Sequence, residues 1–202
     1  MLLDDLGRYN EYGCRPKSFS FWKHMARQAY THPGLLAVVV YRYGGWVRRC
    51  RIPVVKHICE AYYQFLYGWV RFHLQIEVPR DTVIGPGFRI DHYGGILINS
   101  QAVIGRNFTA TQGLLVGQTE TGAPHIGDDV HCGVGCKIIG GIVLGDGIKI
   151  GAGAVVTRSF EGNMVIAGVP ARMLRKLDGP PRPGGWIPPT ERSMSPTEEA
   201  VS

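Results

Sequence analysis

Asp91 and His92 are neighbouring side chains suited to proton transfer. An imidazole has a pKa near 6.5, so near neutral pH His92 can take the proton of an attacking hydroxyl group and pass it to a leaving group. A base of this kind works better when a carboxylate holds its second ring nitrogen. Glu77, fifteen residues earlier, is our candidate for that carboxylate. The alternatives are a surface histidine, a solvated Glu77 and an Asp91 that only stabilises a turn.

Other cysteine and histidine residues have less reactive interpretations. We expect Cys132 and Cys136 to be small core residues rather than nucleophiles, because both fall at inward positions of the repeat described next. His125 and His131, together with His92, are the residues from which a metal site would be built. Histidines six positions apart in this repeat lie on different faces, so we expect no metal ion.

The segment that carries these residues repeats every six positions. It spans residues 76–177 and holds 19 of the 28 glycines. A period of six matches neither the 3.6-residue turn of a helix nor simple strand alternation, so the pattern predicts a chain that winds in coils. The leading residues of the hexads are Ile84, Ile90, Ile98, Ile104, Ala110, Val116, Ile126, Cys132, Ile138, Leu144, Ile150 and Val156.

Three hexads make one triangular coil of 18 residues, in which each side is a short strand and each leading residue points inward. Glycine supplies the backbone freedom that the corners require. Each coil buries its apolar face only against the next, so we predict a parallel β-solenoid. Two insertions, at residues 92–97 and 118–125, interrupt the winding, and such loops are frequent functional sites. The expected stacked pairs are Ile126 with Leu144, Cys132 with Ile150, and Ile138 with Val156.

Two further segments flank the repeat. Residues 1–75 hold few glycines, and we predict a cap of helices at about 18–30, 35–49 and 53–74. Residues 178–202 contain 6 of the 13 prolines, and this composition predicts a disordered tail. The expected fold is therefore mainly β, with a helical cap before the solenoid and a Pro-rich tail after it.

The composition excludes several classes of protein. The chain has 202 residues and a net charge of +6, and its 45% hydrophobic content excludes a wholly disordered protein. No apolar run approaches the ~18 residues of a membrane-spanning helix. The first residues lack the features of a secretory signal, and the five cysteines do not form a disulfide framework, so we expect a cytoplasmic protein. No recognition-helix motif accompanies the positive charge, and we expect no nucleic-acid partner.

Three groups of residues resemble the hexapeptide-repeat acyltransferases and, within that superfamily, serine acetyltransferase. They are Ile90–Asn99, with the sequence IDHYGGILIN, Ala102–Gly105, with AVIG, and Ile166–Arg172, with IAGVPAR. The resemblance covers about residues 35–177. It implies a left-handed parallel β-helix and a homotrimer whose acetyl-CoA sites lie in clefts between subunits. The cap is short, so a hexamer is a less expected assembly.

The resemblance also implies roles for individual residues. His92 is the expected general base of an acetyl transfer, Asp91 matches a substrate-contacting residue, and Glu77 stands where the family has aspartate. We expect backbone N–H groups near Gly117 to stabilise the oxyanion and His125 to contact the acceptor. Acetyl-CoA is expected as acyl donor, and the residues assigned to it are Gly117, Val134, Lys149, Ala152, Arg158 and Arg172.

The sequence leaves the acceptor open. Serine acetyltransferases hold their substrate with an Arg-His pair, whereas this chain has Gly122-Ala123-Pro124-His125 and no arginine there. A carboxylate is normally bound by a guanidinium or equivalent donors. Serine or a related small hydroxyl compound therefore competes with a sugar hydroxyl on a glycan or its lipid-linked precursor. An inactive scaffold or regulatory subunit is a third alternative, against which the intact Asp91-His92 pair speaks.

One apolar stretch raises the question of a membrane. Residues 35–47 are strongly apolar and precede Arg48, Arg49 and Arg51, a pattern compatible with a helix on an anionic membrane surface. We favour the ordinary alternative, in which the helix packs against neighbouring subunits and the arginines are solvated.

Overall fold

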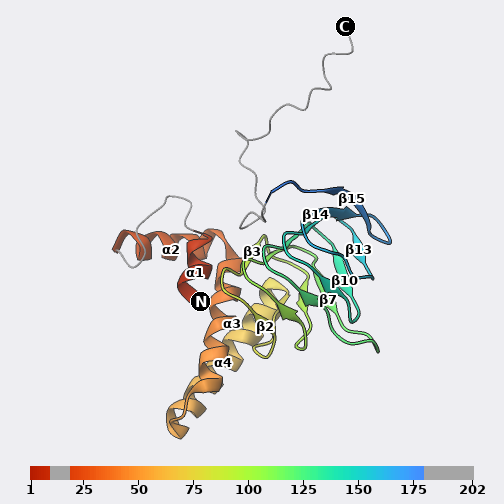
Figure 1. Cartoon of the computed structure of the whole chain (residues 1–202). Coiled ribbons are helices and arrows are strands. Elements are labelled where there is room, and N and C mark those ends of the chain that lie inside the picture. The colour runs from red at the N-terminus through yellow and green to blue at the C-terminus, as the bar shows by residue number, and fades with distance from the viewer. Residues whose placement is uncertain (10–18, 180–202) are drawn as a thin grey trace.

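The computed structural model describes residues 1–9 and 19–179. Most of the predicted tail, and Ser18 at the start of the first predicted helix, lie outside the described residues. The helices come first and the strands follow (Figure 1). The helices are α1 (Leu2–Gly7), α2 (Phe19–Thr31), α3 (Pro33–Arg49) and α4 (Pro53–Trp69), and α4 continues into a π-helical turn, η1 (Val70–Leu74).

Short strands form three sheets that make the sides of a triangular prism. Sheet A contains β1 (Ile76–Glu77), β4 (Ile96–Ile98), β7 (Leu115–Gly117), β10 (Lys137–Ile139) and β13 (Val155–Val156). Sheet B contains β2 (Val83–Ile84), β5 (Val103–Ile104), β8 (His125–Ile126) and β11 (Val143–Leu144). Sheet C contains β3 (Arg89–Asp91), β6 (Thr109–Thr111), β9 (His131–Cys132), β12 (Lys149–Ile150), β14 (Met164–Ala167) and the antiparallel β15 (Arg172–Lys176).

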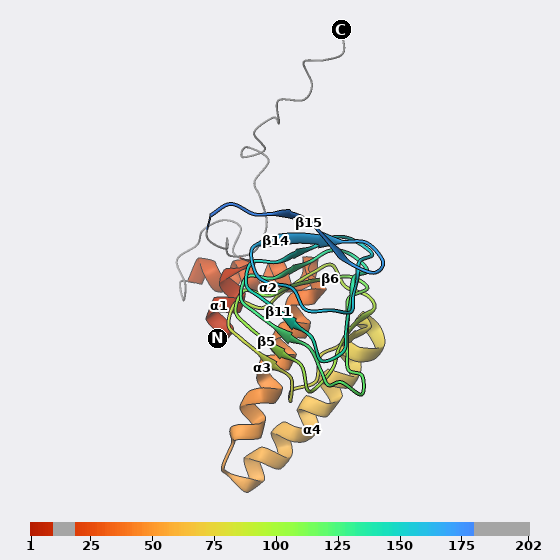
Figure 2. The same ribbon diagram turned by 45° about the vertical axis from the view of Figure 1, so that its right-hand side comes forward.

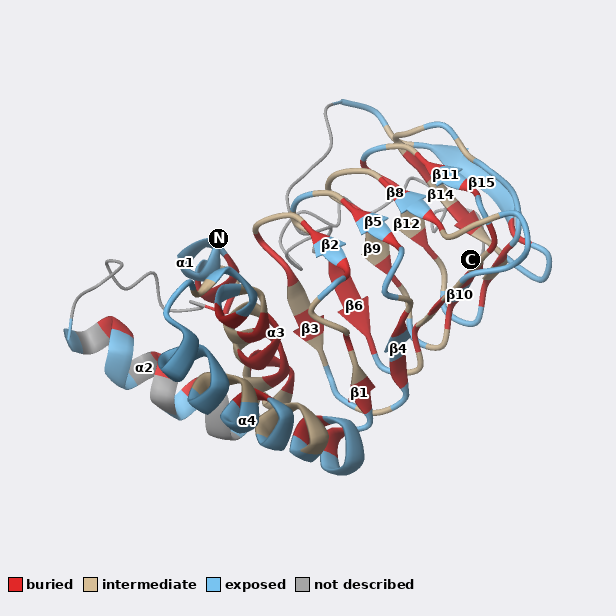
Figure 3. Cartoon of the chain, turned by 90° about the horizontal axis from the view of Figure 1, so that it is seen from below, coloured by how far each residue is buried: buried red, intermediate tan, exposed pale blue. Residues whose placement is uncertain are grey.

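The strand registers confirm the predicted winding. Ile126 pairs with Leu144, Cys132 with Ile150, and Ile138 with Val156, all in parallel ladders. All twelve leading residues of the hexads are buried, at 4% exposure or less. Figure 3 shows buried segments along the strands of the prism. The apolar period of six therefore specifies the core of the solenoid.

The chain passes from sheet A to B to C in every coil, so the prism has three long edges, which we call the A–B, B–C and C–A edges. At the B–C edge successive coils approach so closely that a Cβ on Gly85 would lie 2.7 Å from the carbonyl of Gly105. A larger residue does not fit there, which explains the glycine that follows each leading residue at this edge.

Both predicted insertions are present, at two different edges. The register is Ile90 with Ala110 before the C–A edge and Ile98 with Val116 after it, so the first insertion adds two residues. At the A–B edge the register changes from Ile98 with Val116 to Ile104 with Ile126, which adds four residues before His125. Both loops leave the prism where the winding would otherwise turn a tight corner.

Helix α3 closes the first coil of the solenoid. A Cβ on Gly34 would lie 2.5 Å from the Ile90 carbonyl oxygen, so this helix touches β3 directly. One face of α3, which includes Val38 and Val47, is buried and shares one hydrophobic core with the strands. The buried face of residues 35–47 therefore packs on the chain's own solenoid, and the expected packing against neighbouring subunits stays a prediction.

Helix α4 returns along α3 and forms a hairpin with it. The two helices project beyond the prism, and their connection is the part of the hairpin farthest from the strands (Figures 1 and 2). Proline stands in the first turn of each helix, where its missing N–H leaves no intrahelical bond unmade. None of the described helices is long and apolar enough to cross a membrane.

Helix α1 was not expected from the sequence, and it is fastened to the solenoid by polar contacts. The Asp5 carboxylate is fully buried, pairs with Arg42 and accepts a hydrogen bond of 2.8 Å from the Phe88 backbone N–H. Arg42 also donates to the carbonyl oxygens of Ile84 and Gly85. These bonds connect the chain start, α3 and the first B–C corner.

Candidate active site

His92 is the first residue after β3, on the C–A edge. Its φ of +59° lies in the left-handed region, in which residues other than glycine are uncommon. Its side chain is exposed and has no hydrogen-bond partner among residues 1–9 and 19–179. The two inserted residues and the left-handed turn leave the imidazole accessible to a substrate. Asn107 and Asp129 have the same left-handed φ at other corners of the solenoid, so the φ of His92 places its side chain but does not by itself mark a functional residue.

Asp91, at the end of β3, is held by a basic neighbour. The Arg89 Nε–H donates to its carboxylate. Arg89 in turn donates to the Arg8 carbonyl oxygen and lies over the Tyr9 ring, with 5.3 Å from its guanidinium carbon to the ring centre. Asp91 is thus placed beside His92 as a fixed, charge-balanced carboxylate. Its expected contact with a substrate stays a prediction.

Glu77 lies on the outer face of β1, in the coil that precedes the His92 turn. The Ile96 N–H bonds the Gln75 carbonyl, so the turn that carries His92 returns beside the start of β1. The carboxylate, however, forms an ion pair with Arg71, with 3.1 Å between Oε2 and Nε. Within the described residues, no hydrogen bond joins Glu77 to His92. A pairing of the two side chains stays a prediction, with Arg71 as a competing partner.

A column of glycines, which was not predicted from the sequence, continues along the C–A edge from His92. Gly95, Gly113, Gly135 and Gly153 all have positive φ, between +65° and +74°. A Cβ on Gly113 would lie 3.1 Å from the Cα of Gly135. Their recurrence at about one coil length is the signal that would have identified them. The result is an edge poor in side chains along which an extended ligand can lie.

The residues assigned to CoA and substrate divide between two edges. Val134 and Ala152 are exposed on the C–A edge, between the glycines of the column. Lys149 lies just before this edge on β12, and Arg172 pairs with Ala167 at the end of β14. These four residues share the edge of His92.

The remaining assigned residues lie on the A–B edge. Gly117 ends β7, His125 begins β8, and the loop between them is closed by reciprocal backbone bonds of Thr119 and Gly122. Arg158 follows β13, with its guanidinium carbon 5.1 Å from the Phe160 ring centre. One chain therefore does not bring His125 or Gly117 to His92.

The sequence did not reveal the environment of the His131 side chain. It lies on the outer row of sheet C, between Thr109 and Lys149, and its Nδ1 atom is buried without a hydrogen-bond partner. Burial lowers the pKa of His131 below 6.5, and the positive charges of Lys149, Arg8 and Arg89 lower it further, whereas Asp91 raises it. The neutral imidazole is therefore favoured in the folded chain.

Cys132 and Cys136 are fully buried, as expected for core residues. Burial raises the pKa of the Cys132 thiol well above its usual value, which suppresses the nucleophilic thiolate. Among the described residues, no three His, Cys, Asp or Glu side chains are grouped so that they could hold a metal ion.

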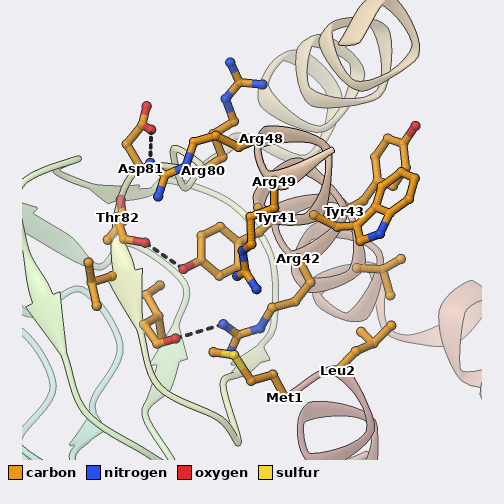
Figure 4. A pocket seen from close by; sticks show the side chains of 15 residues that line it. Met1, Leu2, Tyr41, Arg42, Tyr43, Arg48, Arg49, Arg80, Asp81 and Thr82 are labelled. Atoms are coloured by element: carbon orange, nitrogen blue, oxygen red, sulfur yellow. Dashed lines mark hydrogen bonds and ion pairs between the residues drawn. The ribbon is translucent and has the colours of Figure 1, made fainter. Parts of the chain in front are cut away.

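A cavity of about 610 Å³ lies at the helical end of the molecule, away from His92. Figure 4 shows Tyr41 in its wall, where the Tyr41 hydroxyl donates to the Thr82 carbonyl at 2.7 Å. Arg48, Arg49 and Arg80 also line it. None of the residues assigned from the sequence lines this cavity, so its size does not identify it as the catalytic site.

Comparisons with known proteins identify relatives of the chain. No protein-family model matches the chain. It is 30% identical to a serine acetyltransferase of Synechococcus elongatus over 173 residues, which covers 84% of this chain and 66% of the relative. It is 39% identical to a serine acetyltransferase of Bacillus subtilis over 148 residues, with 71% and 65% coverage. The chain therefore spans just under two thirds of the length of these relatives.

Solved structures show the same likeness. A serine acetyltransferase of Brucella abortus, in complex with coenzyme A, superposes with a TM-score of 0.68 at 25% identity, covering 87% of this chain and 67% of that one. Stacked coils of hexads place the chain in the class of hexapeptide-repeat proteins. Within that class, the chain belongs to the serine acetyltransferase-like proteins.

Proposed function

We propose that this chain transfers the acetyl group of acetyl-CoA to the hydroxyl group of serine or a related small hydroxyl compound. The hydroxyl oxygen attacks the thioester carbonyl as His92 takes its proton, and the C–S bond then breaks. His92 returns the proton to the departing thiolate, so the products are an ester and CoA. The observation that carries this proposal is the position of His92, whose exposed side chain lies where the glycine column begins.

The C–A edge supports the binding of the acyl donor. The glycine column leaves room for a narrow, extended chain such as the pantetheine arm of CoA. We assign Val134 and Ala152 to contacts along this arm. Lys149 and Arg172 add positive charge near the same edge and suit the CoA phosphates. Because acetyl-CoA is made inside the cell, we place the enzyme in the cytoplasm.

We further propose a homotrimer, because the assigned residues lie on two edges. The A–B edge of one subunit, set against the C–A edge of its neighbour, brings Gly117, His125 and Arg158 to a His92. Sheet B offers a surface for this contact: Val83, Val103 and Val143 are exposed in one outward row, at 58%, 38% and 57%, and His125 lies among them. A contiguous apolar row of this kind is typical of a subunit interface.

One observation favours a neutral acceptor as the second candidate. The loop of residues 118–124 contains no arginine or lysine, and its polar groups include Thr119 and Thr121, whose hydroxyls are 2.8 Å apart. Hydroxyl groups suit a sugar better than a carboxylate, which needs cationic donors. A sugar O-acetyltransferase is therefore the alternative to a serine acetyltransferase.

The test is CoA thiol release from acetyl-CoA with a panel of serine, homoserine and simple sugars. Release with serine supports the first proposal, and release with sugars alone supports the second. Absence of release with every acceptor, in a protein that still binds CoA, contradicts both and favours a scaffold. Native mass measured in parallel tests the trimer.

A further inference from the structure

The α3–α4 hairpin carries an exposed apolar stripe. Along α4 and η1 its members recur every three or four residues, so they lie on one helical face. They are large residues with exposures between 39% and 78%, whereas soluble proteins normally expose such side chains singly. The stripe consists of Ile52, Val55, Ile58, Tyr62, Phe65, Trp69 and Phe72.

The same hairpin is basic. Residues 33–59 contain no aspartate or glutamate, and Arg48, Arg49, Arg51 and Lys56 lie at its turn. Arg48 pairs with Asp81, at 2.7 Å between Nη1 and Oδ1. The other three cations are exposed and have no ion pair with any residue of the described chain. Glu60, the one acidic residue of the hairpin, pairs with Arg80, so the apolar stripe is adjacent to three cations that have no ion pair within the described chain.

Aromatic side chains border the stripe on α3. Trp46 is 53% exposed and stacks on Tyr43, with ring centres 5.8 Å apart, and Tyr43 meets Tyr62 of α4 edge to face at 6.0 Å. Trp and Tyr are enriched where a protein meets the interface between lipid tails and water. Trp46 and Arg49 also line the cavity of Figure 4, which continues this surface towards sheet B.

We propose that the exposed face of the α3–α4 hairpin docks on an anionic membrane surface, with the apolar stripe at the level of the headgroups and Arg49, Arg51 and Lys56 against lipid phosphates. The contact is peripheral. It is made mainly by α4, because the apolar face of α3 is buried against the solenoid. Charge decides between this partner and a second hairpin. Two copies placed turn to turn would bring these cations together, and the one acidic residue of the hairpin, Glu60, already pairs with Arg80, whereas anionic lipid supplies the opposite charge.

Co-sedimentation of the full chain with vesicles tests this proposal. Vesicles of equal parts phosphatidylcholine and phosphatidylglycerol should bind the protein at low salt, and vesicles of phosphatidylcholine alone should bind it at least about tenfold less. The double variants Arg49→Glu/Arg51→Glu and Ile58→Ser/Phe65→Ser should each reduce binding to the mixed vesicles by about tenfold or more. The matched charge control is Arg175→Glu/Lys176→Glu on β15, at the opposite end of the solenoid, which should bind like the wild type.

Two results would overturn the proposal. One is an equal loss of binding to the mixed vesicles in the β15 control. The other is a reduced native mass of Ile58→Ser/Phe65→Ser, combined with no vesicle binding by the wild type, which would show that the stripe is covered by a second copy. All the substituted side chains are exposed, and far-ultraviolet circular dichroism verifies that the variants fold.

Discussion

Glu77 and Arg71 form an ion pair, with 3.1 Å between Oε2 and Nε. Both side chains are partly exposed, so the pair itself adds little stability. Its significance lies in its position, because Glu77 is the carboxylate assigned to orient His92 and Arg71 lies in the π-helical turn before β1. π-helical turns occur frequently at functional sites. The helical cap and the candidate site are therefore linked through one carboxylate.

The first prediction separates the two possible partners of Glu77. If the carboxylate orients His92 during the reaction, Glu77→Gln should lower kcat by at least about tenfold, because an amide does not stabilise an imidazolium ion. The KM for acetyl-CoA should change little. Arg71→Ala removes the competing partner and should keep kcat within about twofold of the wild type. Steady-state kinetics of thiol release measures both, and an equal loss in the two variants would refute the orienting role.

The second prediction concerns pH and His131. Its pKa is lowered in the folded chain by burial, so the unfolded chain takes up the proton at a higher pH than the folded chain does. The free energy of unfolding should therefore fall as the pH drops from about 6.5 towards the folded pKa. His131→Gln should weaken this dependence. Urea unfolding at about pH 7.5 and 5.5 gives the measurement.

The control for His131 is His57→Gln. His57 is exposed on α4, and its Nδ1 lies 2.7 Å from the Pro53 carbonyl oxygen. This variant should retain the pH dependence of the wild type. The explanation fails if His131→Gln and the wild type lose the same free energy over this range.

The third prediction concerns the buried carboxylate of α1. Asp5→Ala leaves the Arg42 guanidinium and the Phe88 N–H without this partner in a buried environment. Removing one member of a buried ion pair costs about 3 to 5 kcal/mol. Asp4→Ala is the matched control, because within the described residues Asp4 forms one ion pair, with the exposed amino group of Met1, and its loss should cost less than about 0.5 kcal/mol. Equal thermal stability of the two variants would contradict a fastening role for Asp5.

The fourth prediction tests the glycine column. Gly113 has a φ of +74°, and a Cβ there would lie 3.1 Å from the Cα of Gly135. Gly113→Ala should therefore destabilise the chain by about 1 to 3 kcal/mol. Gly68→Ala on α4 should instead stabilise it by about 0.5 to 1 kcal/mol, because a Cβ there meets nothing within 4 Å and alanine favours the helix. Denaturant unfolding distinguishes these signs, and a neutral Gly113→Ala would show that the column tolerates side chains.

The period of six predicted the solenoid because its cause is local. Each coil repeats the same environment, so Ile126 and Leu144 stack for the same reason as Cys132 and Ile150. The insertions were visible for the same reason, as interruptions of a regular pattern. The motif around His92 identified the candidate base. In the structure His92 lies on an edge of the prism, where its side chain is exposed.

Other features depend on contacts between distant parts of the chain. Asp5 bonds the N–H of Phe88, 83 residues later, and no local pattern indicates this contact. The apolar residues of α3 and α4 are similar in type, yet Val38 is buried and Phe65 is 69% exposed. Periodicity identifies an apolar face but not what covers it. The division of the assigned residues between two edges likewise depends on the number of residues in each coil.

The most direct test of the account is the turnover of His92→Ala with acetyl-CoA and the acceptor found active in the panel. If His92 is the general base, kcat should fall by about 10² to 10⁴ while the variant keeps the unfolding midpoint of the wild type. Wild-type turnover in a folded His92→Ala protein would contradict the central claim, because the proton would then be taken by another group.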